Sequence, residues 1–187
     1  LSTFVRIVLS ACITFIISLI IGYIYSWRKE SYYFIKPVMN LMKSTPVIII
    51  SIFLFLLFNS SVSPFIITML VTMPITTQSI FTSIDSIDPS IQDDIKMNNV
   101  HQLKAWFIVY MPLIKKHLLM SFFQTFGLGL KVMIMGEYIC YTKNSIGQEL
   151  SQIKSSFEIS NLLAWGILIV LIVTISEKLI NYIVKEK

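Results

Sequence analysis

The stretch STPVIIISIFLFLLFNSSVSPFIITMLVTMPITTQSIFTSI, residues 44–84, contains no charged side chain over 41 residues. A membrane-spanning helix needs roughly 20 apolar residues, so this stretch is long enough for two spans. The polar turn Asn59-Ser60-Ser61-Val62-Ser63 divides the stretch and predicts a short connection between two helices. The stretch is therefore predicted to form a pair of membrane helices.

Composition extends this prediction to the whole chain. Of 187 residues, 55% are hydrophobic and only 13% are charged, whereas a soluble domain carries about 25% charged residues. The two cysteines, Cys12 and Cys140, are too few for a disulfide framework or a tetrahedral zinc site. We expect an all-α integral membrane protein with a single transmembrane domain over residues 1–187.

The apolar segments predict five transmembrane helices. Pro74 is expected to kink the third of them and to free the carbonyl of Leu70, because proline has no amide hydrogen to donate. The expected bounds are Phe4–Tyr25, Pro37–Phe58, Pro64–Ile84, Pro112–Tyr138 and Ile159–Ile183.

The distribution of basic residues predicts the orientation, since lysine and arginine concentrate on cytoplasmic loops. Only Lys143 and Lys154 fall on one side of the predicted membrane. Eleven fall on the other side: Arg28, Lys29, Lys36, Lys43, Lys96, Lys104, Lys115, Lys116, Lys178, Lys185 and Lys187. The loop after residue 84 and the C-terminus are therefore predicted to be cytoplasmic, and residues 141–158 to lie outside. This topology accounts for the net charge of +5 without a nucleic-acid partner.

The patterns of catalytic chemistry are missing from the sequence. It has no Gly-x-x-x-x-Gly-Lys-Ser/Thr phosphate loop, which excludes the usual ATP-hydrolysing machinery. His101 and His117 are sixteen positions apart and lack a nearby acidic ligand pattern. Asp93 and Asp94 are adjacent, so on a helix their side chains point about 100° apart and form no acid–base pair. We expect no enzymatic activity, no cofactor and no metal site.

The cytoplasmic loop of residues 85–111 has the features of two short helices. Asp88 followed by Pro89 is a typical helix start, with an N-cap acceptor and a proline at the first helical position. Asn98 and Asn99 tolerate the left-handed conformation that ends a helix. A second stretch, Gln102–Tyr110, is predicted to be helical up to Pro112. The loop is either a docking element for a partner or a plain connection.

This loop resembles the coupling loop of permease subunits in binding-protein-dependent ABC importers. That loop reads Glu-Ala-Ala, three residues, Gly, nine residues, Ile-x-Leu-Pro. The acid, the turn residue, the branched apolar residue and the proline have counterparts at the same spacing, whereas the two alanines and the glycine do not. The positions that the resemblance assigns to ATPase coupling are Asp93, Asp94, Ile95, Asn99, Val109, Met111 and Pro112.

Further matches extend the resemblance from about Arg6 to Leu179. Lys36-Pro37 and Ser44-Thr45-Pro46 resemble proline-bearing landmarks of the family. Residues 127–131 (GLGLK), 136–138 (GEY) and 145–147 (SIG) resemble its sulfonate, taurine and nitrate branch. The resemblance implies a type I permease fold that conducts a small solute, such as a small anion, across a bacterial inner membrane. It also implies cytoplasmic ATPases, an external substrate-binding protein and a second permease subunit, identical or different, as partners. Because the family usually has one more N-terminal helix and no methionine leads this chain, we expect that helix to be missing.

Several polar residues inside the spans are candidates for the translocation path. Thr68, Thr72, Thr76 and Ser79 recur at helical spacing in the third span, although hydroxyl stripes also serve as contacts between membrane helices. A charge within a span is costly and marks a functional candidate, which singles out Lys131. The alternatives for Lys131 are an ammonium that reaches the membrane surface, or one that pairs with Glu137 or another subunit.

Two other classes of membrane transport protein fit parts of the pattern. A secondary transporter or channel would need carboxylates inside the membrane, yet no Asp or Glu occurs between Glu30 and Asp85. The substrate-binding component of an energy-coupling vitamin importer would lack a docking loop like residues 88–112. A membrane enzyme is the least favoured class, because the sequence offers no nucleophile, metal ligands or carboxylate pair for one.

Overall fold

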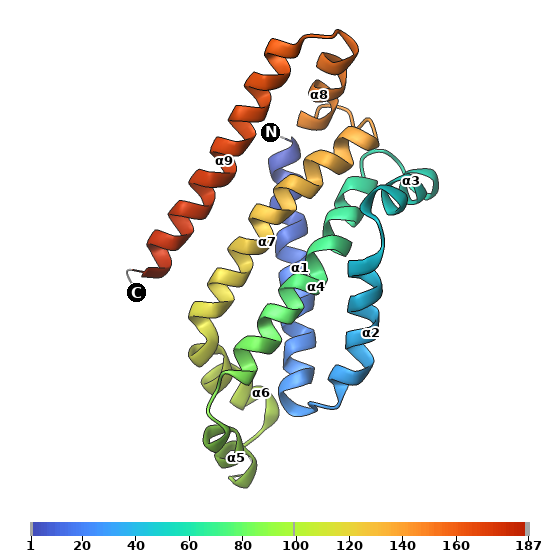
Figure 1. The fold of residues 1–187 in the computed structure, drawn as a ribbon. Coiled ribbons are helices and arrows are strands. Elements are labelled where there is room, and N and C mark those ends of the chain that lie inside the picture. Colours follow the sequence, from blue (N-terminus) through green and yellow to red (C-terminus); the bar gives the residue numbers. More distant parts are fainter. Residues whose placement is uncertain (1, 99, 186–187) are drawn as a thin grey trace.

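The computed structural model describes the backbone of residues 2–98 and 100–185, and these residues are almost entirely helical. Figure 1 shows long helices side by side, with shorter ones at both ends of the bundle. In chain order the elements are α1 (Ser2–Trp27), α2 (Ser31–Ser44), α3 (Val47–Leu57), α4 (Ser63–Asp85), α5 (Pro89–Met97), α6 (Gln102–Ala105), a π-helical turn (Trp106–Tyr110), α7 (Met111–Ile139), α8 (Ile146–Ser155) and α9 (Ile159–Lys185).

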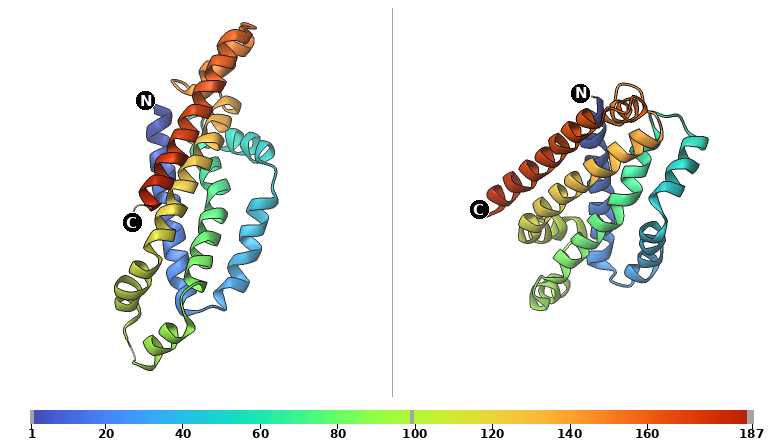
Figure 2. Two further views of the ribbon diagram at one scale, coloured as in Figure 1. Left: turned by 60° about the vertical axis from the view of Figure 1, so that its left-hand side comes forward. Right: turned by 45° about the horizontal axis from the view of Figure 1, so that its top comes forward.

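The core of the bundle is formed by α1, α4 and α7, which pack on one another along their length (Figures 1 and 2). The buried face of α1 carries small side chains, among them Thr14, Ser18 and Gly22. A Cβ atom on Gly22 would lie 2.5 Å from the Cγ2 atom of Ile80. A small residue at position 22 is therefore required for α4 to approach α1 this closely.

The second predicted span, Pro37–Phe58, is wrong as a single helix. The structure has two helices there, α2 and α3, bent by 93° at the break between Ser44 and Val47. The break follows from Pro46, which has no amide hydrogen and disfavours helical geometry in the residue before it. Thr45 accordingly has extended backbone angles, and its hydroxyl donates to the carbonyl of Leu41.

The expected number of five spans is not confirmed within the described residues. Three helical segments are long and apolar enough to cross a membrane, and the bent pair of α2 and α3 makes a fourth if it counts as one span. In α9, the described apolar part, Ile159–Ile175, is shorter than these. The first and third predicted spans agree with α1 and α4 to within two residues at each end.

The fourth span begins earlier than predicted. Helical structure is continuous over Gln102–Ile139, so Gln102–Tyr110 is the start of this span and not a separate helix that stops at Pro112. A π-helical turn, Trp106–Tyr110, directly precedes Met111 and Pro112. There the amide of Met111 donates to the carbonyl of Trp106, five residues back. We infer that this shifted bonding accommodates a proline without ending the helix.

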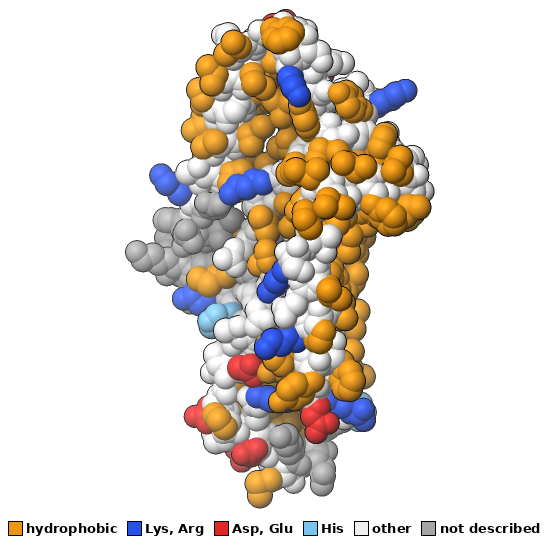
Figure 3. Space-filling model, turned by 45° about the vertical axis from the view of Figure 1, so that its right-hand side comes forward, with side chains coloured by type: hydrophobic (Ala, Val, Ile, Leu, Met, Phe, Trp, Pro, Cys, Tyr) orange, Lys and Arg blue, Asp and Glu red, His pale blue; other side chains and the backbone are white. Residues whose placement is uncertain are grey.

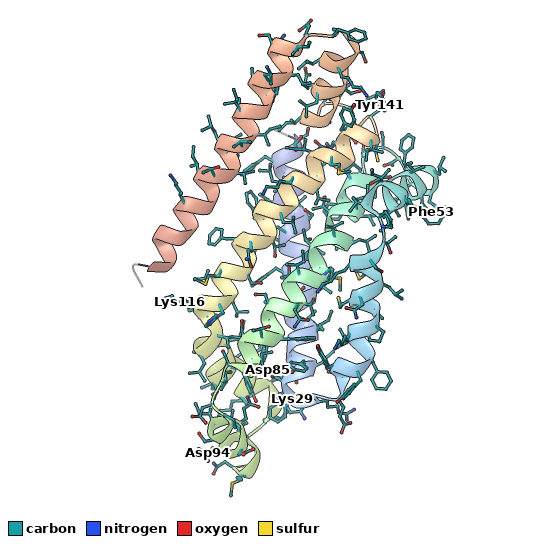
Figure 4. All side chains as sticks on the ribbon, in the orientation of Figure 1. Lys29, Phe53, Asp85, Asp94, Lys116 and Tyr141 are labelled. Atoms are coloured by element: carbon teal, nitrogen blue, oxygen red, sulfur yellow. The ribbon has the colours of Figure 1, made fainter. Side chains whose placement is uncertain are left out.

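The two ends of the bundle carry different short helices. α5 lies at one end, and α8 lies at the opposite end with the N-terminus of the described chain (Figure 1). Between the ends, large apolar side chains are exposed, including Phe53 on the projecting helix α3 (Figure 4) and most of α9 up to Ile175. Such a surface suits contact with lipid or with another apolar chain.

Candidate functional site

The helix α5 is the centre of the candidate site, and Asp88 defines its start. The backbone amide and the hydroxyl of Ser90 both donate to Asp88 Oδ1, at 2.9 and 2.8 Å. These two hydrogen bonds lower the pKa of Asp88, the hydroxyl contributing more than the amide. The predicted N-cap and the proline at the first helical position are confirmed.

One face of α5 packs on the bundle. Ile95 is buried in an apolar cluster with Ile84, Ile87 and Trp106. The Gln92 amide nitrogen, also buried, donates to the carbonyls of Ile84 in the last turn of α4 and of Ile87 just after it. α5 is therefore attached to the last turns of α4 and to the first turns of the segment that continues into α7.

The opposite face of α5 is exposed. Asp93 and Asp94 are exposed, and Met97 retains 80% of its surface. Figure 4 shows Asp94 pointing away from the bundle at its lower end. Asn99, which the resemblance assigns to the turn after α5, lies outside the described residues. Asp93, Asp94 and Ile95 thus divide between an outward acidic face and an inward apolar one.

The other predicted coupling residues lie at the beginning of the long segment Gln102–Ile139. Val109 and Met111 are partly buried against the same apolar cluster that receives Ile95. Pro112 is exposed. Val109 and Met111 therefore pack against the base of α5 and do not form part of its outward face.

A polar contact that the sequence did not predict closes this end of the bundle. The hydroxyl of Tyr25, at the end of α1, donates to the carboxylate of Asp85 at the end of α4, with distances of 2.9 and 2.8 Å to its two oxygens. The Lys29 ammonium lies 3.0 Å from the same carboxylate (Figure 4). A signal was available, because Asp85 is the first acidic residue after Glu30.

The hydroxyl stripe of α4 faces the interior of the chain. Thr68, Thr72 and Thr76 are 1% exposed, and each hydroxyl donates to the carbonyl four residues earlier in α4. The Thr76 hydroxyl also shares a hydrogen bond with that of Thr125 on α7. Ser79 is half-buried. This geometry matches the alternative of helix-to-helix contact, and the path assignment stays a prediction.

Lys131 and Glu137, the other two path candidates, have different environments. Lys131 is exposed on α7. Glu137 is fully buried: Arg6 is 3.0 Å from one of its carboxylate oxygens, and the Thr3 hydroxyl donates to the other at 2.9 Å. Arg6, on α1, is therefore the ion-pair partner of Glu137. The structure thus separates the two candidates.

The described residues contain no cluster of three or more potential metal ligands. The features that remain are a bundle of apolar helices, a capped helix carrying an acidic face at one end, and a second short helix at the other. This combination is that of a polytopic membrane protein with a short, partly exposed helix between two of its spans.

The comparisons with known proteins identify the class. Residues 8–186 match the family described as binding-protein-dependent transport system inner membrane component. The chain therefore belongs to this family of ABC importer permeases, whose members are normally not themselves catalytic. No curated protein sequence matches the chain significantly.

A solved structure is similar in fold. An inward-facing structure of the MetNI methionine ABC transporter matches with a TM-score of 0.82 and 15% sequence identity, covering 99% of this chain and 92% of that chain. At this identity the likeness concerns the fold alone, which is that of a type I ABC importer permease. Neither comparison supports assignment to the sulfonate, taurine and nitrate branch.

Proposed function

We propose that this chain is the permease subunit of an ATP-driven importer and that α5 couples it to a cytoplasmic ATPase. The observation that carries the proposal is the division of α5 into two faces. Ile95 and Gln92 attach the helix to the bundle, whereas Asp93, Asp94 and Met97 remain exposed beyond it. A helix held on one face and free on the other is suited to transmit movement of a bound partner to the spans.

The contacts at the base of α5 support transmission in a definite direction. Its apolar face meets the end of α4 and the π-helical turn that leads into α7. Because α4 and α7 pack along their length in the core, displacement of α5 would shift both helices together. ATP-driven movement of the ATPases would thereby alternate the spans between inward-open and outward-open states.

The family description and the fold likeness to an ABC transporter support a set of partners. We infer two ATPase subunits on the cytoplasmic side, an external substrate-binding protein, and a second permease subunit of the same or another sequence. The solute is inferred to be small. The motifs around Lys131 and Glu137 favour an anion of the sulfonate, taurine or nitrate kind, and Lys131, being exposed, is proposed to line the path.

The docking proposal is tested by reversing the charge of the outward face. Asp93→Lys with Asp94→Lys should abolish co-purification of the ATPase while the protein remains inserted, because both side chains are exposed and neither supports the bundle. The matched control is Glu149→Lys, an exposed acidic position on α8 at the opposite end. Retention of the ATPase and of uptake by the double variant would show that α5 is a plain connection.

Lys131→Met tests the path assignment, since it removes the charge and keeps the length of the side chain. Uptake into vesicles with matched protein levels should fall, with dimer assembly unchanged. Unchanged uptake, or loss of assembly in detergent, would make Lys131 a structural residue.

A further inference from the structure

The helix α2 presents three distinct faces. One packs on α4 and on the apolar cluster around it, and consists of Tyr32, Ile35, Met39 and Met42. A second is exposed and apolar, and consists of Phe34, Val38 and Leu41. The third, which we term the basic stripe, is exposed and consists of Lys36, Asn40 and Lys43. At 3.6 residues per turn, the basic stripe lies roughly 160° around the helix from the exposed apolar face.

The basic stripe rises into the height of the bundle. α2 begins two residues after Lys29, which pairs with Asp85 at the cytoplasmic end. Lys43 lies 12 residues beyond the first residue of α2, a rise of about 18 Å. The next helix, α3, contacts the outer end of α4, where the Ser63 hydroxyl donates to the carbonyl of Leu54. Lys43 therefore lies between the two ends, and its predicted placement in a cytoplasmic flank needs revision.

The two lysines of the stripe have no carboxylate nearby in sequence, because no acidic residue occurs between Glu30 and Asp85. The ion pairs found among the described residues, Arg6–Glu137 and Lys29–Asp85, include neither lysine. The Lys36 ammonium lies over the ring of Tyr32, 5.1 Å from its centroid. Two positive charges are thus presented outward on one face.

The position of the stripe relative to the apolar face indicates its surroundings. Charged side chains within membrane helices almost always face the protein interior or a water-filled cavity, and they mark solute pathways. Phe34, Val38 and Leu41 already provide α2 with a face for lipid on its other side. Figure 3 shows Lys and Arg side chains at several heights of the surface, beside an apolar edge. On α4, which contacts α2, Gln78 and Thr82 are exposed as uncharged polar groups.

We propose that the basic stripe of α2 lines the solute path and binds the anionic group, a carboxylate or another oxyanion, of the transported solute. The inference rests on the proposed function and deepens it, because it gives the permease itself a preference for anions. Asn40, between the two lysines, adds a hydrogen-bond donor for the same group. The phosphate of an anionic lipid has the same chemistry, so the experiment must distinguish the two sources.

The test uses cysteine labelling of the assembled transporter in phosphatidylcholine vesicles. Asn40→Cys is compared with Leu41→Cys, the matched position on the apolar face, and the unmodified protein gives the background from Cys12 and Cys140. Because the thiolate reacts only where water reaches it, a methanethiosulfonate reagent carrying a sulfonate should label position 40 about tenfold faster than position 41. Equal rates at the two positions would overturn the proposal.

The charge of the stripe is tested with a second reagent and a second background. The measured quantity is the labelling rate with the sulfonate reagent divided by the rate with its trimethylammonium counterpart. This ratio should fall about fivefold when Lys36→Gln and Lys43→Gln are added to Asn40→Cys, because two nearby positive charges are lost. A ratio that does not change would show that these lysines do not act at the site. Lys43→Cys provides a second labelling position in the same stripe.

Protection distinguishes the solute from lipid. Sodium sulfate should slow labelling at position 40 in vesicles of phosphatidylcholine alone. If sulfate does not slow labelling at position 40, the proposal is overturned. If phosphatidylglycerol in the vesicles slows labelling where sulfate does not, the stripe is assigned to a lipid headgroup. Labelling does not require a bound ATPase, so the proposal fails or holds separately from the docking role of α5.

Discussion

The Arg6 guanidinium lies 3.0 Å from the carboxylate of Glu137, a residue 131 positions later in the sequence. Glu137 is completely buried, and Arg6 is only one-fifth exposed. The hydroxyl of Thr3 donates a hydrogen bond to Glu137 and accepts one from the backbone amide of Ile146 at the start of α8. Three helices, α1, α7 and α8, therefore meet at a single ion pair at the end of the bundle that carries α8.

Removal of one partner of this ion pair should destabilise the protein strongly. Arg6→Met leaves the buried carboxylate of Glu137 without its cation, and a broken buried pair costs about 3–5 kcal/mol. The measurement is the free energy of unfolding in detergent, obtained by titration with a denaturing surfactant.

Two further variants make this prediction specific. Lys143→Met removes an exposed charge from the connection between α7 and α8 and should change the free energy of unfolding little. Arg6→Met combined with Glu137→Leu should recover most of the loss, because no uncompensated charge remains. A loss in Arg6→Met no greater than that in Lys143→Met would mean that the ion pair does not hold this end together.

The contacts of Asp85 should differ in strength. A hydrogen bond to a charged group contributes about 1.5–3 kcal/mol. Tyr25→Phe removes such a bond, which the hydroxyl of the buried Tyr25 donates to Asp85. Lys29 and Asp85 are about half exposed, so their pair is worth about 0–1 kcal/mol. Unfolding of Tyr25→Phe and Lys29→Met under one condition compares the two, and a larger loss in Lys29→Met would contradict this ranking.

The start of α5 should depend on pH. The pKa of Asp88 is lowered below its ordinary value of 3.8 by hydrogen bonds from Ser90. Its ionised form therefore contributes stability that is complete above pH 3.8 and lost as the pH falls through the lower folded-state pKa. The protection factor of the amides of residues 90–97, which is the intrinsic exchange rate divided by the observed one, should be constant from pH 7 to 5. It should fall below pH 3.8. In Asp88→Asn, which keeps an acceptor but does not titrate, this step should be missing.

Features that depend on local sequence could be predicted. The bounds of α1 and α4 followed from where charge and polar turns interrupt the apolar pattern. The start of α5 was predictable because Asp88 and Pro89 act within one helical turn. In each case the determining interaction lies within a few residues of the feature.

Features that depend on distant contacts or on backbone register could not be predicted. Arg6 and Glu137 give no sign of pairing in the sequence, because α1 and α7 are brought together only by packing. Pro46 and Pro112 are both helix-breaking residues, yet one ends a helix and the other follows a π-helical turn without ending one. Burial of the α4 threonines against α7 likewise depends on which helix is its neighbour, which their spacing does not reveal.

At the end of the bundle that carries α8, Gly147 should be the glycine least tolerant of substitution. α8 lies so close to the end of α7 that a Cβ atom at position 147 would be 2.3 Å from the backbone nitrogen of Tyr138 and 2.5 Å from the carbonyl carbon of Glu137. Backbone atoms cannot rotate away as a side chain can, so Gly147→Ala must displace α8 or the end of α7. Overpacking of this kind typically costs about 1–3 kcal/mol.

The matched control for Gly147→Ala is Gly166→Ala in α9, where an added Cβ meets nothing within 4 Å. Alanine is favoured over glycine inside a helix by about 1 kcal/mol, so Gly166→Ala should be neutral or slightly stabilising in the same unfolding measurement. Because Ile146 donates its amide to Thr3, displacement of α8 should also loosen the contacts around Arg6 and Glu137. Gly147→Ala should then destabilise the protein less when Arg6→Met and Glu137→Leu are already present. If Gly147→Ala costs the same in both backgrounds, α8 and the ion pair are independent.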